Sequence, residues 1–327
     1  MVKRWENIGM RGVFLDLDTV SHRGDVDLTP LRQVLTDLHT FGATPAEQVP
    51  QRVDGMEVVI ANKVKLSSAL LSRFPRVRLI CVAATGTNNV DLDAAHGRGI
   101  TVCNVPAYST LSVVQQVFAF ILSLTQHLRE YEALLQQGAW RRAPQFTLLD
   151  YPIRELAGKK LGILGYGDIG KAVAKVAEAL GMQILISARN ADDQRHGRLP
   201  LAELLPQVDV LTLHVPLLPE TRNLICAKEL ALMKHDALLI NCARGGIVDE
   251  QALADALRAH KLGGAGIDVL SEEPPVHGNP LLSRGIPNLI ITPHTAWASR
   301  EARQRVIVET AANIAAFKRE ERRNRVA

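Results

Sequence analysis

The chain has 327 residues, of which 47% are hydrophobic, 38 are Lys or Arg and 34 are Asp or Glu. This length exceeds that of one ordinary domain, so we expect two packed domains. The net charge of +4 is spread along the chain, which argues against nucleic acid as the main partner. The segment 318–323 alternates in sign after an apolar-periodic helix, a pattern typical of a solvated end.

The cysteines and the N-terminus indicate the compartment. The four cysteines, Cys81, Cys103, Cys226 and Cys242, form no C-x-x-C pair, and three of them lie in apolar, strand-like or strand-edge sequence. The first seven residues lack the apolar region of a secretory signal, and no apolar run approaches the ~18 residues of a membrane span. We expect a soluble cytoplasmic protein without a metal.

The first third of the chain alternates between two kinds of segment. Residues 13–17, 58–61 and 79–84 are predicted as strands, and residues 66–71 as a helix. This alternation is typical of a parallel α/β sheet. A helical pattern without interior Gly or Pro then covers 111–136, which is long enough to bridge two domains.

A second and more regular series follows. Strands are predicted at 160–164, 183–186, 209–213, 237–241, 266–269 and 289–291. Six such strands match a full Rossmann sheet. A final helix over 299–317 has an apolar face that allows it to return and pack on the first domain.

A glycine motif stands between the strand at 160–164 and an amphipathic helix. It reads Gly165-Tyr166-Gly167-Asp168-Ile169-Gly170. The first glycine permits a tight turn, the second lets the main chain approach a pyrophosphate, and the third lets the helix lie close to the sheet. The motif in this context predicts a dinucleotide site.

The end of the next strand bears on which dinucleotide is bound. It reads Ile186-Ser187-Ala188-Arg189-Asn190, and the first acids, Asp192 and Asp193, lie beyond it. An NAD site usually has a carboxylate here to bind the ribose diol. Its absence removes repulsion toward a 2′-phosphate, which Arg189 with Ser187 and Asn190 is suited to bind. We therefore favour NADP(H), with NAD(H) as the alternative.

Three further segments place special residue types at predicted strand ends. They begin at Asn241 (NCARGG), Asp268 (DVLSEEP) and Thr292 (TPHTAW). Together with the glycine motif, in this order, they resemble the D-isomer-specific 2-hydroxyacid dehydrogenase family over nearly the whole chain. The segments 84–91 and 271–275 are most similar to its glycerate dehydrogenase or hydroxypyruvate (glyoxylate) reductase branch.

The resemblance implies a catalytic set of three residues. Arg244 would bind the carboxylate and oxo groups of the substrate, since a forked guanidinium suits a planar 2-oxo acid. His294 would be the acid-base, protonating the carbonyl oxygen or removing the hydroxyl proton. Glu273 would orient the imidazole and favour its protonated form. Glu272 is the competing candidate for this role. Glu273 is favoured because it directly precedes Pro274, as the family motif requires.

The resemblance also implies binding residues at other strand ends. On the cofactor side these are His214, Val215, Pro216, Thr221, Cys242, Ala243, Asp268 and Ala296. For the substrate carboxylate, the family uses main-chain amides of a glycine turn, here at Thr85 and Gly86. Lys63 follows another predicted strand and either faces the substrate or is a solvated loop lysine.

The implied architecture is a flavodoxin-like substrate domain, 1–104 plus 297–327, into which a dinucleotide-binding Rossmann domain, 105–296, is inserted. The active site would lie in the cleft between them, and the protein would be a homodimer acting on a small 2-oxo or 2-hydroxy acid. Two alternatives stay open: a formate- or phosphite-oxidising relative, and a nucleotide-sensing corepressor. Glu273 speaks against the formate type, in which glutamine precedes the proline.

Overall fold

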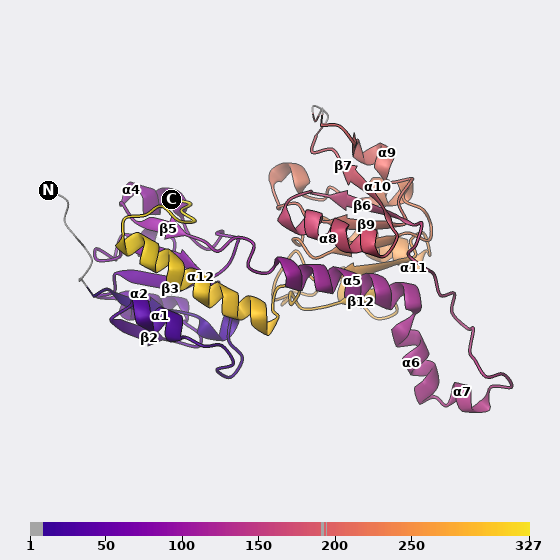
Figure 1. Ribbon diagram of the computed structural model, residues 1–327, viewed down its shortest axis with the longest axis horizontal. Coiled ribbons are helices and arrows are strands. Elements are labelled where there is room, and N and C mark those ends of the chain that lie inside the picture. The colour runs from indigo at the N-terminus through magenta and orange to yellow at the C-terminus, as the bar shows by residue number, and fades with distance from the viewer. Residues whose placement is uncertain (1–8, 191–192, 194) are drawn as a thin grey trace. The chain divides into compact units, whose positions relative to one another are not determined.

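The computed structural model describes residues 9–190, 193 and 195–327. The chain divides into two compact units (Figure 1). Unit 1 comprises Met1–Ser109 and Ala298–Ala327, and unit 2 comprises Thr110–Trp297. Each unit is built on its own parallel sheet, which confirms the predicted α/β class.

Unit 1 contains a five-stranded sheet in the order β2-β1-β3-β4-β5, with all neighbours parallel. This is the flavodoxin-like order. Its strands are β1 (Arg11–Phe14), β2 (Asp37–Thr40), β3 (Val58–Ala61), β4 (Leu79–Val82) and β5 (Thr101–Cys103). The predictions for β1, β3 and β4 are confirmed to within a few residues. The edge strands β2 and β5 were missed because β2 is only partly apolar and β5 has three residues.

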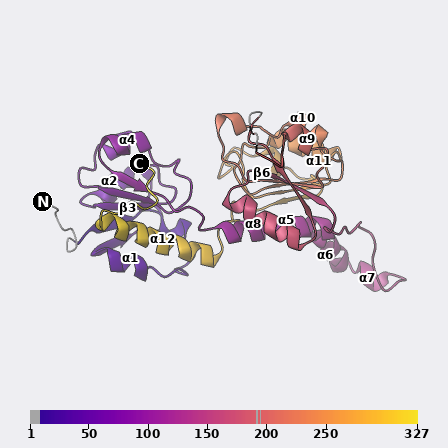
Figure 2. The ribbon, with the colours of Figure 1, turned by 45° about the horizontal axis from the view of Figure 1, so that its top comes forward.

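Helices cover both faces of this sheet (Figure 2). On one face lie α1 (Thr29–Val34) and α12 (Arg300–Lys318), which pack against each other. On the other face α2 (Val49–Val53), α3 (Ser68–Leu71) and α4 (Leu92–Gly97) bury apolar side chains against the strands. The expectation that the final helix packs on the first domain is therefore confirmed.

Unit 2 contains a seven-stranded parallel sheet in the order β12-β11-β10-β9-β6-β7-β8. Its strands are β6 (Lys160–Leu164), β7 (Gln183–Ser187), β8 (Arg198–Leu199), β9 (Val210–Leu213), β10 (Leu238–Asn241), β11 (Gly264–Ile267) and β12 (Leu289–Ile291). The strand order reverses between β6 and β9, and Rossmann sheets bind ligands at this point. The six predicted strands are present. The seventh, β8, has two residues and left no periodic signal.

The helices of unit 2 also form two layers (Figure 2). The first layer is α5 (Thr110–Gln126) and α8 (Asp168–Ala179), whose apolar side chains share a core with β6, β9 and β10. The second is α9 (Leu201–Leu204), α10 (Ala227–Leu232) and α11 (Glu250–Arg258) on the opposite face. Burial on both faces explains why these strands are continuous apolar runs.

The prediction of a single helix over 111–136 is wrong. The chain bends by 55° between α5 and α6 (Leu128–Gln136), and a short helix, α7 (Ala139–Arg142), follows. His127 adopts a left-handed conformation with φ 52° at the bend, and its ring stacks on Tyr151 at 5.4 Å. No single helix of the described residues is long and apolar enough to cross a membrane; α5 and α6 meet that test only together, across the bend.

Candidate active site

The glycine motif joins β6 to α8, and each of its glycines has a distinct surrounding. Gly165 has φ 95°, and a Cβ there would lie 2.5 Å from the carbonyl oxygen of His214. A Cβ on Gly170 would lie 2.2 Å from the oxygen of Gly165. Gly167, at the start of α8, has no atom within 4 Å of its Cβ position. Packing thus requires two glycines, and the third leaves room for a phosphate at the amino end of the helix.

The end of β7 carries exposed basic residues. Arg189 and Asn190 are exposed, while Ser187 is buried and donates to the oxygen of Ala188. Asp193 accepts hydrogen bonds from the Arg189 amide at 2.7 Å and from two guanidinium nitrogens of Arg195 at 2.7 and 2.6 Å. The bond from Arg195 is the main cause that lowers the pKa of Asp193. The negative charge of this carboxylate is therefore neutralised by the Arg195 guanidinium. Asp192 lies outside the described residues.

Strand β9, which pairs with β6 on the side opposite β7, ends in the segment predicted to contact the cofactor. Burial lowers the pKa of His214 to about 4, so its ring is neutral near pH 7. Its Nε2 lies 3.0 Å from the hydroxyl of Thr212. The Thr221 hydroxyl donates to the oxygen of Pro216 and accepts from the Leu218 amide, both at 2.7 Å. These bonds shape the loop that follows Val215.

The turn after β10 presents Arg244. The buried side chain of Asn241 accepts from the Ala243 amide at 3.0 Å and donates to the oxygen of Arg244 at 2.9 Å. Arg244 is exposed. A Cβ on Gly245 would lie 1.9 Å from the oxygen of Leu270, so only glycine lets the loop after β11 cross this turn. Cys242 is buried, and burial raises the pKa of its thiol well above the usual range.

The loop after β11 holds Glu273 against His294. One carboxylate oxygen of Glu273 accepts from the Leu270 amide at 2.9 Å, and the other lies 2.6 Å from Nδ1 of His294. Because an ionised carboxylate only accepts hydrogen bonds, Nδ1 carries the proton and Nε2 is left for a reacting oxygen. The competing Glu272 instead contacts Nδ1 of His277, an exposed residue, at 2.6 Å. The register argument thus selected the glutamate that contacts His294.

Asp268 holds the segment that carries His294. Its buried carboxylate accepts from the Thr292 hydroxyl and, at 2.9 Å each, from the amides of Thr295 and Ala296. Its main-chain oxygen accepts from the His294 amide at 2.7 Å. Burial is the larger influence and raises the pKa of Asp268 despite these bonds. Sequence reasoning assigned Asp268 and Ala296 to the cofactor and missed this positioning role, because the partners lie 24 to 28 residues away.

Unit 1 carries the predicted substrate residues at one sheet edge. Lys63 follows β3, and Thr85 and Gly86 follow β4, the adjacent parallel strand. Lys63 and Thr85 are exposed. The buried carboxylate of Asp16 accepts from the amides of Asn62, Lys63 and Val64 at 2.6 to 3.0 Å. Asp16 had no role in the sequence analysis, since nothing in the local pattern marks its contact with a segment 46 residues away.

The fold and these residues define the class. A Rossmann sheet presents a glycine turn suited to a dinucleotide, and the same carboxyl edge carries an exposed arginine and a histidine bound to a glutamate. These features together are typical of a nicotinamide-dependent oxidoreductase. Among the described residues, no group of three or more His, Cys, Asp or Glu could hold a metal ion.

Comparisons with known proteins identify the family. The sequence model of the D-isomer specific 2-hydroxyacid dehydrogenase NAD binding domain matches residues 118–296. A glycerate dehydrogenase from Methylorubrum extorquens is 45% identical over 83% of this chain and 85% of its own length. A hydroxypyruvate reductase from Blautia hydrogenotrophica is 39% identical over 84% of this chain and 86% of its own. The chain belongs to the D-isomer specific 2-hydroxyacid dehydrogenase family.

A solved structure shares the fold and contains a nicotinamide cofactor. An acyclic imino acid reductase in complex with NADPH and D-arginine superposes with a TM-score of 0.84 at 26% identity, covering 97% of this chain and all of that one (100%). The protein is therefore an NAD(P)-dependent oxidoreductase acting on small 2-hydroxy or 2-oxo acids. The predicted family and enzyme class are confirmed.

Replacing Asp268 by Asn tests the clamp on the His294 segment. The amide would turn a donor toward one of the three groups that Asp268 accepts from, so we expect Asp268→Asn to lower the free energy of unfolding by about 1–3 kcal/mol. Urea titration measures this. The exposed Asp255→Asn on α11 is the matched control and should change stability by less than about 0.5 kcal/mol. Equal stability of the two variants would show that the carboxylate is not what orders this segment.

Proposed function

We propose that this protein reduces hydroxypyruvate and glyoxylate, to D-glycerate and glycolate, with Arg244, Glu273 and His294 as its catalytic residues. The observation that carries the proposal is the 2.6 Å contact between Glu273 and Nδ1 of His294 at the carboxyl edge of the Rossmann sheet. The two relatives named glycerate dehydrogenase and hydroxypyruvate reductase support this choice of substrate.

The residues of unit 2 divide the chemistry between them. Bound nicotinamide would donate or accept the hydride. Nε2 of His294 would give a proton to the carbonyl oxygen in reduction and take it from the hydroxyl in oxidation, while Glu273 holds the ring by Nδ1. Arg244 would bind the carboxylate and oxo groups, because its forked guanidinium pairs with two oxygens at once.

The proposal gives each unit a role. Unit 2 would be the dinucleotide domain predicted at 105–296, using Gly165 to Gly170 and the ends of β7, β9 and β10. Unit 1 would be the substrate domain predicted at 1–104 plus 297–327. Main-chain amides at Thr85 and Gly86, and the exposed Lys63, would bind the substrate carboxylate.

NADP(H) is the cofactor that we propose over NAD(H). No carboxylate stands at 187–190, and the Asp193 carboxylate is compensated by Arg195. Arg189 is exposed beside it, and the guanidinium of Arg198 lies 5.0 Å from the centre of the Tyr166 ring in the glycine motif. This concentration of positive charge suits a 2′-phosphate. The imino acid reductase of similar fold was solved with NADPH.

The protein is also proposed to be a homodimer. The segment from α6 to residue 153 extends from the end of α5 in unit 2 (Figure 1) and exposes large apolar side chains. Phe146 is 89% exposed, Leu149 82% and Trp140 54%. An apolar surface of this kind on one projecting segment is typical of a protein interface.

A reducing cytoplasm is the proposed compartment. All four cysteines are free thiols. Cys81, Cys103 and Cys242 are buried, and burial raises the pKa of each, so they behave as small apolar core residues.

The activity is tested by loss of 340 nm absorbance with hydroxypyruvate and with glyoxylate. His294→Gln should lower kcat by about 10²- to 10⁴-fold and leave the Kd for the cofactor nearly unchanged. His277→Gln is the matched control, because His277 makes the same 2.6 Å contact with a glutamate in the same loop but is exposed. Unchanged turnover in His294→Gln would remove His294 from the mechanism, and oxidation of formate or phosphite instead would assign the alternative branch.

Arg189→Ala tests the cofactor choice. Loss of a charged hydrogen bond to a 2′-phosphate should raise the Kd for NADPH by about 10- to 100-fold and change that for NADH by less than about threefold. Fluorescence titration of each reduced cofactor measures both constants. Arg258→Ala on α11, which is exposed and paired with Asp255, is the control. Equal weakening of NADPH and NADH would contradict a 2′-phosphate contact.

The dimer is tested by placing charge on the projecting segment. Phe146→Asp with Leu149→Asp should convert a dimer into a monomer, since a buried unpaired carboxylate is costly at an interface. Light scattering after size exclusion measures the mass. Val276→Asp, at a side chain 72% exposed outside this segment, should leave the mass unchanged. A double variant that stays dimeric would place the interface elsewhere.

A further inference from the structure

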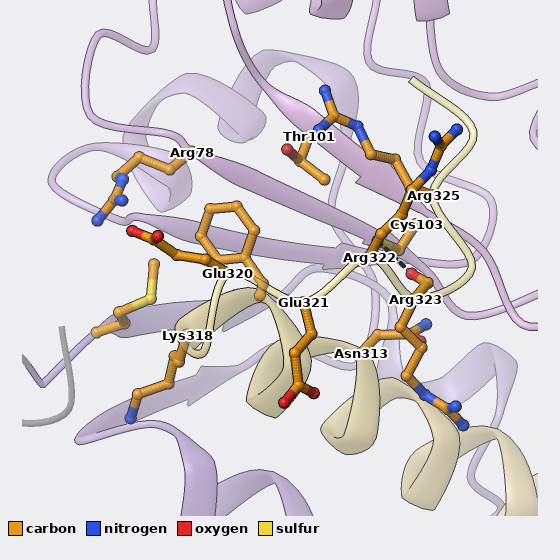
Figure 3. A pocket seen from close by; sticks show the side chains of 12 residues that line it. Arg78, Thr101, Cys103, Asn313, Lys318, Glu320, Glu321, Arg322, Arg323 and Arg325 are labelled. Atoms are coloured by element: carbon orange, nitrogen blue, oxygen red, sulfur yellow. Dashed lines mark hydrogen bonds between the residues drawn. The ribbon is translucent and has the colours of Figure 1, made fainter. Parts of the chain in front are cut away.

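Unit 1 contains a pocket of about 250 Å³ that the proposed function does not use (Figure 3). It is lined by Arg78 just before β4, by Thr101 and Cys103 of β5, and by the end of α12 with the segment after it. The chain after α12 is held beside β5, where the Val326 amide donates to the Val102 oxygen at 2.8 Å. The charged segment 318–323, expected to be a solvated end, therefore folds back to form a wall.

The lining side chains carry a net positive charge. Five are basic, namely Arg78, Lys318, Arg322, Arg323 and Arg325, and two are acidic, Glu320 and Glu321. Of these, Glu321 pairs with Arg319 at 2.8 Å and Arg323 pairs with Glu309, and neither partner lines the pocket. The excess of three positive charges is thus unchanged by these two pairs.

Of the other basic residues, Lys318, Arg322 and Arg325 make no ion pair with Glu320 or Glu321. Lys318 donates to the main-chain oxygen of Val34 at 3.2 Å, and Arg325 donates to an oxygen of the last residue, Ala327, at 2.8 Å. Arg322 makes no ion pair with any residue that the structure describes. In Figure 3 Arg322 and Arg325 lie on the side of Thr101 and Cys103, the Arg323 side chain points away past Asn313, and Arg78 lies on the other side.

The inner surface of the pocket is apolar. It includes the Phe317 ring, with the Arg78 guanidinium carbon 5.5 Å from the ring centre, and the buried side chains of Met10 and Cys103. Burial raises the pKa of Cys103 to about 11, while the charges of Arg325 and Arg323 act in the opposite direction. A basic rim over an apolar floor suits an organic anion better than an inorganic ion.

This pocket is separate from the proposed substrate residues of the same unit. Arg78 precedes β4 and Thr85 follows it, so roughly 20 Å of extended chain separates them. Thr101 begins β5, the parallel neighbour of β4, and so lies at the same end as Arg78. The pocket is therefore near the amino edge of the sheet, whereas Lys63, Thr85 and Gly86 lie at the carboxyl edge.

We propose that this pocket is a second ligand site of the enzyme, for a small organic anion with two or more carboxylate or phosphate groups. Arginine forks pair with both kinds of group. A single exposed charge gains little at physiological salt, so a cluster of basic side chains favours a ligand with several negative groups. The volume lies just below the roughly 300 Å³ of the smallest usual ligand pockets, which excludes a dinucleotide.

Binding would also stabilise unit 1. The cations come from three separate segments, the residue before β4, the end of α12 and the chain beside β5. An anion that contacts all of them links these segments in the folded protein only, and ligands that bind only the folded state raise the unfolding temperature.

The test is calorimetric titration of the NADPH-saturated protein with citrate and with inorganic pyrophosphate, against acetate at matched ionic strength. We expect saturable binding of a multivalent anion and no binding of acetate. Tighter binding of citrate would indicate a carboxylate ligand, and tighter binding of pyrophosphate would indicate a phosphate ligand.

The double variant Arg322→Gln with Arg325→Gln should weaken binding by about tenfold or more, since two charged contacts are lost. Arg322→Gln alone changes an exposed, unpaired side chain and should still weaken it by about threefold.

Two controls separate this site from the proposed active site. Arg76→Gln, an exposed arginine of the same unit outside the pocket, should bind the anion as wild type does. Arg244→Gln should also retain binding, whatever its effect on turnover. The proposal is overturned if wild type shows no saturable binding up to about 10 mM, if both pocket variants bind as tightly as wild type, or if Arg244→Gln abolishes binding.

Discussion

The buried carboxylate of Asp268 is the interaction on which the candidate site depends. It stands just after β11 and accepts three hydrogen bonds from the segment 292–296. A buried charge is costly unless its oxygens are bonded, and its raised pKa records that cost. The bonds give the His294 segment one conformation, including φ 54° at His294 itself. Together with the contact from Glu273, these bonds fix the direction of the histidine ring.

Close contacts between the loops after β10, β11 and β12 then fix the positions of these loops relative to one another. Gly245, after β10, lets the oxygen of Leu270 approach, and the Leu270 amide holds Glu273. Glu273 in turn contacts His294. The first and last of these contacts join the ends of neighbouring parallel strands, so the sheet order sets the site geometry. Between β6 and β9, where the strand order reverses, Gly165 likewise allows a close main-chain contact, in this case with His214.

Unit 1 also contains a buried carboxylate that orders a neighbouring loop. Asp16, buried after β1, accepts from three successive amides after β3 and shapes the loop that carries Lys63. A carboxylate beyond one strand thus orders the loop beyond its neighbour in both units. The other end of the same sheet is closed by α12 and the chain beside β5, where basic side chains gather over an apolar floor. The two anion sites that we propose in unit 1 therefore lie at opposite edges of one small sheet.

The sequence alone determined the fold class, most of the buried strands, the glycine motif and the family. These depend on signals that are local along the chain: apolar runs of strand length, glycines at fixed spacing, and Pro274 as a register mark for Glu273. The order of the sheets could be expected only through the family resemblance. The bend at His127 was missed because a left-handed residue in an apolar-periodic stretch leaves no pattern.

Tertiary structure decided what holds the site together and what else the protein can bind. The carboxylates of Asp16 and Asp268 meet amides tens of residues away, and the basic pocket joins residue 78 to residues near 325. Such partners are neighbours only because the strand order and the returning helix α12 bring them together. Hydrophobic periodicity reports which face of an element is buried, whereas hydrogen-bond partners and the sum of nearby charges depend on which elements become neighbours.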